Sequence, residues 1–403
     1  MTAPLIHAAS PQSVGLSEAR LGRIEAALKR DIDAGLIPGG VVGVMRRGKL
    51  AYLTAVGHRD PQSKEALRDD ALFSIASMTK PLTSVAIMML HEEGRVLLGE
   101  PVSKYLPEVK DNPVATLFDP EKLETRKAAR EPTVQDLLRH TSGFTYADRG
   151  TSAAHKMHPG GSVKAMISLS KAETIKKLAA APLLFDPGSN WQYGFSTDVL
   201  GFIVEAVTGK TLGAFLQERL FAPLGMGDTG FQLAPEKAGR YAQALANDPL
   251  TGARQAIHHA QPHEPKWDSG GGGGLSTAHD YLRFAEMMRC GGTLDGVEIL
   301  GRKTVELMTT DHLPADFGMR IADSMDPAAA GYGFGLGFAV RRQDGIAAMA
   351  GSKGDYYWSG VYGTYFWIDP REELACVFMA AAPGMIRMRY RQMVRGLVYQ
   401  AIM

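Results

Sequence analysis

Apolar positions near the N-terminus change from helical spacing to strand-like runs. Leucines and isoleucines recur every three or four residues between Ser17, a helix-capping residue type, and Gly35, which predicts an amphipathic helix. Two apolar runs follow, at residues 41–45 and 50–56, and they flank the polar segment 46–49, which contains a glycine. Apolar runs separated by a short turn of this kind predict a β-hairpin.

The C-terminal end shows the same elements in the reverse order. Residues 360–368 and 374–381 have the composition of strands, and the polar segment 369–373 joins them. A helix is expected from about residue 386 to residue 401, because its apolar residues fall on one face. Each end of the chain therefore predicts two strands and one helix.

The middle of the chain predicts helices separated by Gly- and Pro-rich loops, with no fixed repeat and no linker. We therefore expect an α+β fold in which both chain ends build one antiparallel sheet, flanked by the terminal helices, with a mostly helical region inserted between them. The expected boundaries are residues 1–75 and 295–403 for the α/β domain and 76–294 for the helical domain. The active site is expected in the cleft between them.

Composition excludes several classes of function. The 403 residues hold 44 basic and 43 acidic side chains, a net charge of +1, whereas a protein that neutralises nucleic-acid phosphates needs a basic excess. Two cysteines, Cys290 and Cys376, cannot form a disulfide scaffold or a Cys-rich zinc site. No apolar run approaches the ~20 residues of a membrane span, and no secretory signal is seen. We expect a cytoplasmic protein that acts on a small molecule without metal or cofactor, and its oligomeric state stays open.

The candidate chemistry lies in the segment 73–81, where Ser77 and Lys80 are three residues apart. On a helix these side chains share a face, and Pro81 places Ser77 at or just before the helix N-terminus. Unpaired backbone N–H groups there favour developing negative charge. Ser168 and Lys171 have the same spacing, so the spacing alone does not identify a nucleophile.

The surroundings of Lys80 distinguish it from Lys171. An apolar helical segment follows Pro81, which places Lys80 at the edge of a core. Because burial disfavours the ammonium, we expect the pKa of Lys80 to lie below its usual value of ~10.4. A neutral lysine can accept the proton of a serine hydroxyl.

Five segments together resemble a known family. Residues 77–80 (Ser-Met-Thr-Lys) resemble the nucleophile motif of serine β-lactamases and penicillin-binding proteins. Residues 193–195 (Tyr-Gly-Phe) resemble the tyrosine motif of class C β-lactamases, and 358–360 (Trp-Ser-Gly) stand in the position of the Lys-Thr-Gly motif. Segments 137–143 and 271–278 resemble recurrent segments of the family VIII carboxylesterases, which are esterases with a class C β-lactamase fold.

The resemblance runs from about Val14 to the C-terminus and implies a role for each matching residue. Ser77 is the implied nucleophile, and Lys80 and Tyr193 share the role of general base. Tyr193 also protonates the leaving group, because a phenol can donate or accept a proton. Which of the two bases holds the proton at rest stays open. The backbone N–H groups of Ser77 and of Val361, expected at the start of a strand, form the implied oxyanion hole.

Departures from the family pattern bear on the substrate. Trp358 stands where β-lactamases have the motif lysine, and Phe195 stands where class C enzymes have an asparagine. An indole offers an apolar wall instead of a positive charge, so both changes favour an uncharged ester over a β-lactam carboxylate. Gly360 and Tyr146 complete the expected substrate-binding set.

We therefore expect a serine hydrolase that cleaves short-chain carboxylic esters through a covalent acyl-enzyme, with weak cephalosporin hydrolysis. Three alternatives remain: an acyltransferase of the same fold that uses an alcohol acceptor, a β-lactamase or D-alanyl peptidase, and a non-catalytic penicillin-binding-like protein. The acyl-chain length, the enantioselectivity and the physiological ester stay open.

Overall fold

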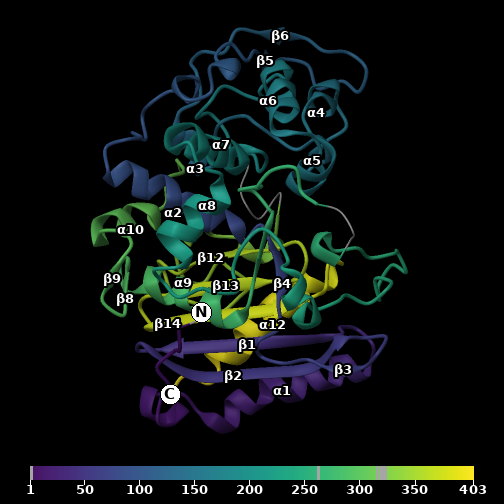
Figure 1. The fold of residues 1–403 in the computed structure, drawn as a ribbon, viewed down its shortest axis with the longest axis vertical. Helices are drawn as coiled ribbons and strands as arrows, with labels where there is room; N and C mark the ends of the chain where they lie inside the picture. Colours follow the sequence, from purple (N-terminus) through teal and green to yellow (C-terminus); the bar gives the residue numbers. More distant parts are fainter. Residues whose placement is uncertain (1–2, 261–263, 315–316, 318–324) are drawn as a thin grey trace.

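One 8-stranded antiparallel sheet forms the centre of the computed structural model, which describes residues 3–260, 264–314, 317 and 325–403 (Figure 1). Its strands are β1 (Gly39–Arg46), β2 (Lys49–Asp60), β3 (Glu65–Ala66), β10 (Tyr332–Phe334), β11 (Ala339–Arg341), β12 (Tyr356–Ser359), β13 (Tyr365–Asp369) and β14 (Leu374–Ala380). The spatial order is β10-β11-β12-β13-β14-β1-β2-β3, and β14 pairs with β1. The two chain ends therefore meet inside one sheet, as expected for the α+β fold.

The hairpin predicted near the N-terminus is confirmed. Arg46 pairs with Lys49, so Arg47 and Gly48 alone form the turn between β1 and β2. Both have positive φ, 53° and 78°, which is the backbone of a type I′ turn and matches the twist of the adjoining strands. The eight residues of β1 are all buried, because helices cover one face of the sheet and further helices cover the other.

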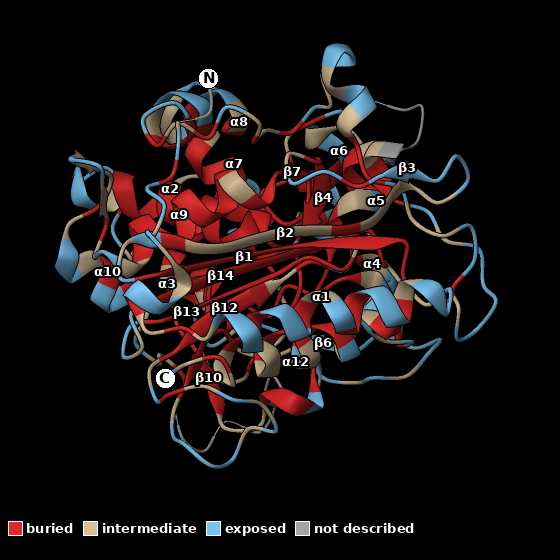
Figure 2. Ribbon diagram, turned by 90° about the horizontal axis from the view of Figure 1, so that it is seen from below, coloured by how far each residue is buried: buried red, intermediate tan, exposed pale blue. Residues whose placement is uncertain are grey.

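The terminal helices pack together on one face of the sheet. Helix α1 (Glu18–Asp33) begins at the predicted cap Ser17 and contacts both β2 and α12 (Ile386–Tyr399). Helix α9 (Ala278–Arg289) contacts β1, β13 and β14, and it lies on the opposite face (Figure 2). Helix α9 lies within residues 76–294, the segment expected to form the helical domain. It packs on the sheet because it carries an apolar face that the sheet buries.

The other helices lie above the central strands in the view of Figure 1, at the end of the molecule away from α1. They are α2 (Thr79–Glu92), α3 (Val134–Leu138), α4 (Ala153–Met157), α5 (Ser162–Ser168), α6 (Lys171–Ala180), α7 (Ser196–Thr208), α8 (Leu212–Leu216) and α10 (Arg302–Met308). Three small sheets pair β4 (Phe73–Ala76) with β7 (Gly274–Ser276), β5 (Val114–Ala115) with β6 (Thr125–Arg126), and β8 (Thr293–Leu294) with β9 (Val297–Glu298). Helices α2 and α7 pack against each other.

One predicted strand is wrong in its boundaries. The segment 360–368 was expected to be a single strand that Val361 begins, but β12 ends at Ser359 and β13 begins at Tyr365. Val361 lies in the turn between them. The turn forms because Gly360 and Gly363 allow it: the N–H of Gly363 donates to Gly360 O, and Gly363 has φ 109°.

Among the helices of the described residues, none alone is long and apolar enough to cross a membrane. The bent pair Ser196–Thr208 and Leu212–Phe221 has the length and composition of a membrane span only when its two parts are taken together.

A buried charge cluster joins α12 to the far end of the sheet. Asp355 accepts hydrogen bonds from Arg341 (2.7 Å), Arg395 (2.7 Å) and Tyr332 (2.6 Å). The carboxylate and Arg395 are completely buried. Because buried guanidinium groups need a counter-charge, Asp355 fixes the position of α12 relative to β10, β11 and β12.

We predict that Asp355→Ala lowers the free energy of unfolding by about 3–5 kcal/mol, because it leaves two buried arginines without their carboxylate. Urea unfolding followed by tryptophan fluorescence measures the change. The control is Asp344→Ala, which removes an exposed ion pair with Arg371 (3.7 Å) and is expected to cost less than about 1 kcal/mol. Equal losses in the two variants would contradict the structural role of the cluster.

Candidate active site

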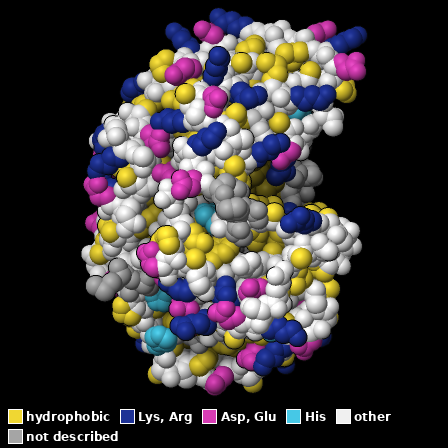
Figure 3. Space-filling model, turned by 45° about the vertical axis from the view of Figure 1, so that its right-hand side comes forward, with side chains coloured by type: hydrophobic (Ala, Val, Ile, Leu, Met, Phe, Trp, Pro, Cys, Tyr) yellow, Lys and Arg dark blue, Asp and Glu magenta, His cyan; other side chains and the backbone are white. Residues whose placement is uncertain are grey.

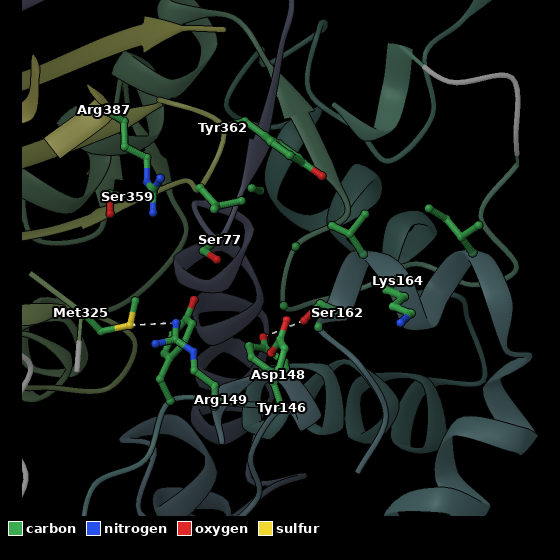
Figure 4. A pocket seen from close by; sticks show the side chains of 18 of the residues that line it. Ser77, Tyr146, Asp148, Arg149, Ser162, Lys164, Met325, Ser359, Tyr362 and Arg387 are labelled. Atoms are coloured by element: carbon green, nitrogen blue, oxygen red, sulfur yellow. Dashed lines mark hydrogen bonds between the residues drawn. The ribbon is translucent and has the colours of Figure 1, made fainter. Parts of the chain in front are cut away.

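Ser77 lies between strand β4 and helix α2, at the base of a cavity (Figure 4). The preceding residue, Ala76, has φ 44°, a left-handed backbone that costs a residue with a Cβ about 1–3 kcal/mol. This bend turns the chain sharply from the strand into the helix. As predicted from Pro81, Ser77 lies just before the helix N-terminus, since α2 begins at Thr79.

Hydrogen bonds from three directions hold the bend. The Thr79 hydroxyl donates to Ala76 O (2.6 Å) and accepts from the N–H of Gly274 (2.9 Å). The Tyr281 hydroxyl donates to Met78 O (2.8 Å). Strand β7 and helix α9 therefore support the backbone on both sides of Ser77, and this support offsets the strain at Ala76.

Lys80 is almost completely buried, with 1% of its surface exposed. Its ammonium donates to Gly271 O (2.5 Å) and to the hydroxyl of Tyr146 (3.2 Å). The same nitrogen lies 4.6 Å from the ring centre of Tyr193. The structure thus brings Lys80, Tyr193 and Tyr146 together beside Ser77, although they come from distant parts of the chain.

A buried carboxylate, Asp198 on α7, faces this group. It accepts hydrogen bonds from the hydroxyls of Ser162 (2.6 Å) and Ser269 (2.5 Å) and from the N–H of Gly271 (2.9 Å). Three donors suit an ionised carboxylate, which only accepts. Gly271 must be glycine, because a Cβ there would lie 2.3 Å from Asp198 Oδ2.

The hydrogen bonds assign the proton of Tyr146. Ser162 has one hydroxyl proton, which it donates to Asp198, so its contact with Tyr146 (2.7 Å) has Tyr146 as donor. The pKa of Tyr146 is raised, chiefly by burial. Tyr146 is therefore a neutral phenol. It accepts a hydrogen bond from Lys80 and donates one to Ser162, so a chain of hydrogen bonds links the Lys80 ammonium to the Asp198 carboxylate.

The expected direction of the pKa shift of Lys80 is wrong. Burial does disfavour the ammonium, but the oxygens of Tyr146 and Tyr193 and the carboxylate of Asp198 favour it, and together they outweigh burial and raise the pKa above its usual value. Burial raises the pKa of Asp198 as well, and the positive charge of Lys80 opposes that shift. Lys80 is consequently a buried cation at neutral pH.

Tyr193 presents a buried hydroxyl that has no hydrogen-bond partner within the described part of the chain. Its ring packs against His140 (4.9 Å between ring centres) and Trp358 (5.5 Å). Burial lowers the pKa of His140 well below its usual value, and Lys80 lowers it further, so His140 is a neutral packing partner. The two rings hold Tyr193 in place.

Two residues expected to contact substrate lie behind the tyrosines instead. Trp358 is 2% exposed and packs against Tyr193, and Phe195 is fully buried against Tyr146 (5.2 Å between ring centres). On strand β12 the residue that lines the cavity is Ser359, which follows Trp358 and points to the opposite face because side chains alternate along a strand. Gly360 is buried too, and Val361 lies on the cavity wall.

The cavity has a volume of about 890 Å³ and opens on one side of the molecule, between the helical part and the sheet (Figure 3). Ser77, Tyr146 and Tyr193 line its base, and Val163, Ile167, Met325, Val361 and Met385 supply apolar surface. Arg149, Lys164, Arg387 and Arg391 also line it, with Asp148 as the acidic member among the described residues. The positive charge that the motif lysine would provide is therefore supplied from other positions, which the sequence did not indicate.

The second Ser-x-x-Lys segment has ordinary contacts. The Ser168 hydroxyl donates to Lys164 O (2.6 Å), as exposed helix serines often do, and Lys171 forms an ion pair with Glu205. Lys171 is thus held by a partner outside the cavity. Within the described residues, no group of three or more His, Cys, Asp or Glu side chains is placed to hold a metal ion.

Sequence reasoning missed Asp198 and Ser162. A weak signal was present for Asp198, because it is one of two acidic residues in the largely apolar helix α7, and the structure buries it completely there. A buried carboxylate needs a charged or hydrogen-bonding partner. Ser162 gave no signal, since its function depends on a contact between α5 and α7 that only the fold creates.

Comparison with known proteins identifies the family of the chain. Residues 24–396 match the family model described as Beta-lactamase. Esterase EstB of Burkholderia gladioli is 31% identical over 386 residues, which cover 89% of this chain and 90% of that protein.

Two solved structures are similar over nearly the whole chain. EstCE1, described as a hydrolase with promiscuous acyltransferase activity, has a TM-score of 0.77 at 26% identity, covering 94% of this chain and 99% of its own. Simvastatin synthase (LovD) from Aspergillus terreus has a TM-score of 0.79 at 25% identity, covering 95% and 98%. With the family model matched over residues 24–396, this chain belongs to the beta-lactamase family of serine hydrolases and is similar to its family VIII esterases.

Proposed function

We propose that the protein is a carboxylesterase that cleaves short-chain esters through an acyl-enzyme on Ser77. The observation that carries the proposal is the position of Ser77 at the base of a cavity with apolar and basic walls, beside buried Lys80 and Tyr193. A serine needs a neighbouring base to become a nucleophile. The 31% identity with an esterase supports the ester as substrate class.

In the proposed reaction Tyr193 acts as the base, in its phenolate form, and the Lys80 ammonium lies 4.6 Å from the centre of its ring. The Ser77 oxygen attacks the ester carbonyl while its proton passes to Tyr193, and Tyr193 then protonates the departing alcohol. Water repeats these steps in reverse and releases the acid. The N–H groups of Ser77 and Val361 stabilise the negative oxygen of both tetrahedral intermediates. The same nucleophile is expected to hydrolyse cephalosporins slowly as a side activity.

Assigning the base to Tyr193 follows from the charges around Lys80. An ammonium whose pKa is raised cannot accept a proton at neutral pH. Tyr146 already donates its proton to Ser162, whereas the Tyr193 hydroxyl is uncommitted among the described residues. Tyr193 is thus the group able to exchange a proton with Ser77.

A second candidate is acyl transfer to an alcohol. The cavity of about 890 Å³ can hold an acyl group and an acceptor together. Of two structural neighbours, one is described as a hydrolase with promiscuous acyltransferase activity and the other as a synthase. Both reactions share the acyl-enzyme and differ only in the second nucleophile.

We predict that Ser77→Ala lowers kcat for p-nitrophenyl butyrate by at least about a thousandfold, because no other group forms the acyl-enzyme. The release of p-nitrophenol measures the rate. Ser84→Ala is the matched control: Ser84 is a buried serine of the same helix that does not line the cavity, and its variant is expected to remain as active as wild type. Retained activity in Ser77→Ala would remove Ser77 from the mechanism.

Asp198→Asn tests the charge state of Lys80. The variant removes the facing negative charge, so burial lowers the pKa of Lys80. If cationic Lys80 is required, the alkaline limb of the kcat/KM profile moves to lower pH, and the rate at neutral pH falls by about tenfold or more.

A matched control for this test is Asp268→Asn. Burial also raises the pKa of Asp268, but this carboxylate accepts from the N–H of Gly213 and lies outside the cavity lining. Its variant is expected to keep the wild-type profile. A faster neutral rate in Asp198→Asn, with the acidic limb moved to lower pH, would instead assign the base to neutral Lys80.

Adding ethanol to the ester assay separates the two candidate functions. The hydrolase is expected to release mainly butyric acid and a smaller amount of ethyl butyrate, and both products are expected to disappear in Ser77→Ala. Gas chromatography measures the two products. Ethyl butyrate without butyric acid would favour the acyltransferase.

A further inference from the structure

An arginine from the last helix reaches the turn that follows strand β12. The Arg391 guanidinium donates to Gly360 O at 2.7 Å, and the side chain is 8% exposed. Burial lowers the pKa of Arg391 to about 10, which leaves the group charged at neutral pH. Helix α12 thus places a buried positive charge on one particular peptide group of the cavity wall.

That peptide group contains the second donor of the proposed oxyanion hole. The carbonyl of Gly360 and the N–H of Val361 belong to one peptide bond, whose atoms lie in a plane and point in opposite directions. A hydrogen bond that fixes the carbonyl therefore fixes the direction of the N–H. Arg391 binds the carbonyl side of this plane, opposite to the N–H of Val361.

The charge also strengthens the donor. Hydrogen bonds to an ionised group are about twice as strong as neutral ones, and hydrogen-bonded groups in a buried site polarise one another. A guanidinium on the Gly360 carbonyl draws electron density away from the Val361 nitrogen. The Val361 N–H becomes a better donor for a negative oxygen.

A second contact fixes the distance between the two donors. A Cβ on Gly360 would lie 2.4 Å from Ile75 O, so only glycine fits against β4 at this point. The Thr364 hydroxyl also donates to Ile75 O (3.2 Å). Because Ile75 precedes Ser77 by two residues, the turn is held directly against the strand that delivers the nucleophile.

We propose that Arg391 is a positioning residue of the oxyanion hole, which orients and polarises the Gly360–Val361 peptide so that its N–H stabilises the negative oxygen of the tetrahedral intermediate. This inference rests on the proposed esterase function and adds a residue to it. Arg391 acts through the peptide and takes no part in proton transfer.

The test compares an ester with its thionoester, in which sulfur replaces the carbonyl oxygen. Sulfur is a weak hydrogen-bond acceptor, so the thionoester gains little from an oxyanion hole. We expect Arg391→Met to lower kcat for the oxygen ester by about tenfold with little change in KM. The thionoester rate is expected to fall much less, which reduces the ratio of the two rates.

Arg389→Met is the matched control, because the half-exposed Arg389 lies on the same helix and pairs with Asp31 (3.2 Å), away from the cavity lining. It is expected to keep the wild-type ratio. Arg391→Lys, which keeps a positive charge without the planar fork, serves if Arg391→Met does not fold, and its ratio is expected to be reduced as well.

The outcomes are distinct. An equal loss with both substrates, or no loss, would assign Arg391 a structural role only and overturn the inference while the esterase function stands. Wild-type protein that hydrolyses neither ester would overturn the proposed function and this inference with it.

Discussion

The buried ammonium of Lys80 is the constraint on which the site depends. A cation with 1% of its surface exposed is unstable without opposing charge, and the chain supplies that charge through Asp198, Ser162 and Tyr146. Through this chain of contacts, the loop that carries Tyr146, helix α5 and helix α7 are linked to Lys80 on α2. The packing of these helices therefore also holds the cation beside Tyr193.

The sheet contributes a different property, which is rigidity around the developing negative charge. The strained bend at Ala76 is held by Thr79 and β7, and the turn after β12 is pressed against Ile75 by Gly360. Because β14 pairs with β1, the strands on either side of the turn between β12 and β13 belong to the same sheet as the N-terminal strands β1 and β2. The two N–H groups assigned to the oxyanion hole are thus fixed by the same framework that positions the nucleophile.

Local patterns predicted the elements well, and contacts between distant segments limited what could be predicted. Spacing and turn residues gave the hairpin, the terminal helices and the place of Ser77 at a helix start. The pKa of Lys80 was predicted in the wrong direction because its counter-charge comes from α7, 118 residues further along the chain. Trp358 was expected to face substrate because the motif comparison aligns positions without showing which face of β12 each side chain occupies. The contact of Arg391 with Gly360 left no pattern in the sequence.

The central claim is that Ser77 carries the acyl group during turnover. Brief incubation with p-nitrophenyl butyrate, acid quenching and peptide mapping by mass spectrometry test it directly. The account predicts a protein heavier by one butyryl group, with the modification on the peptide that contains Ser77. An adduct on another residue, or complete turnover with no adduct at any time after mixing, would contradict it.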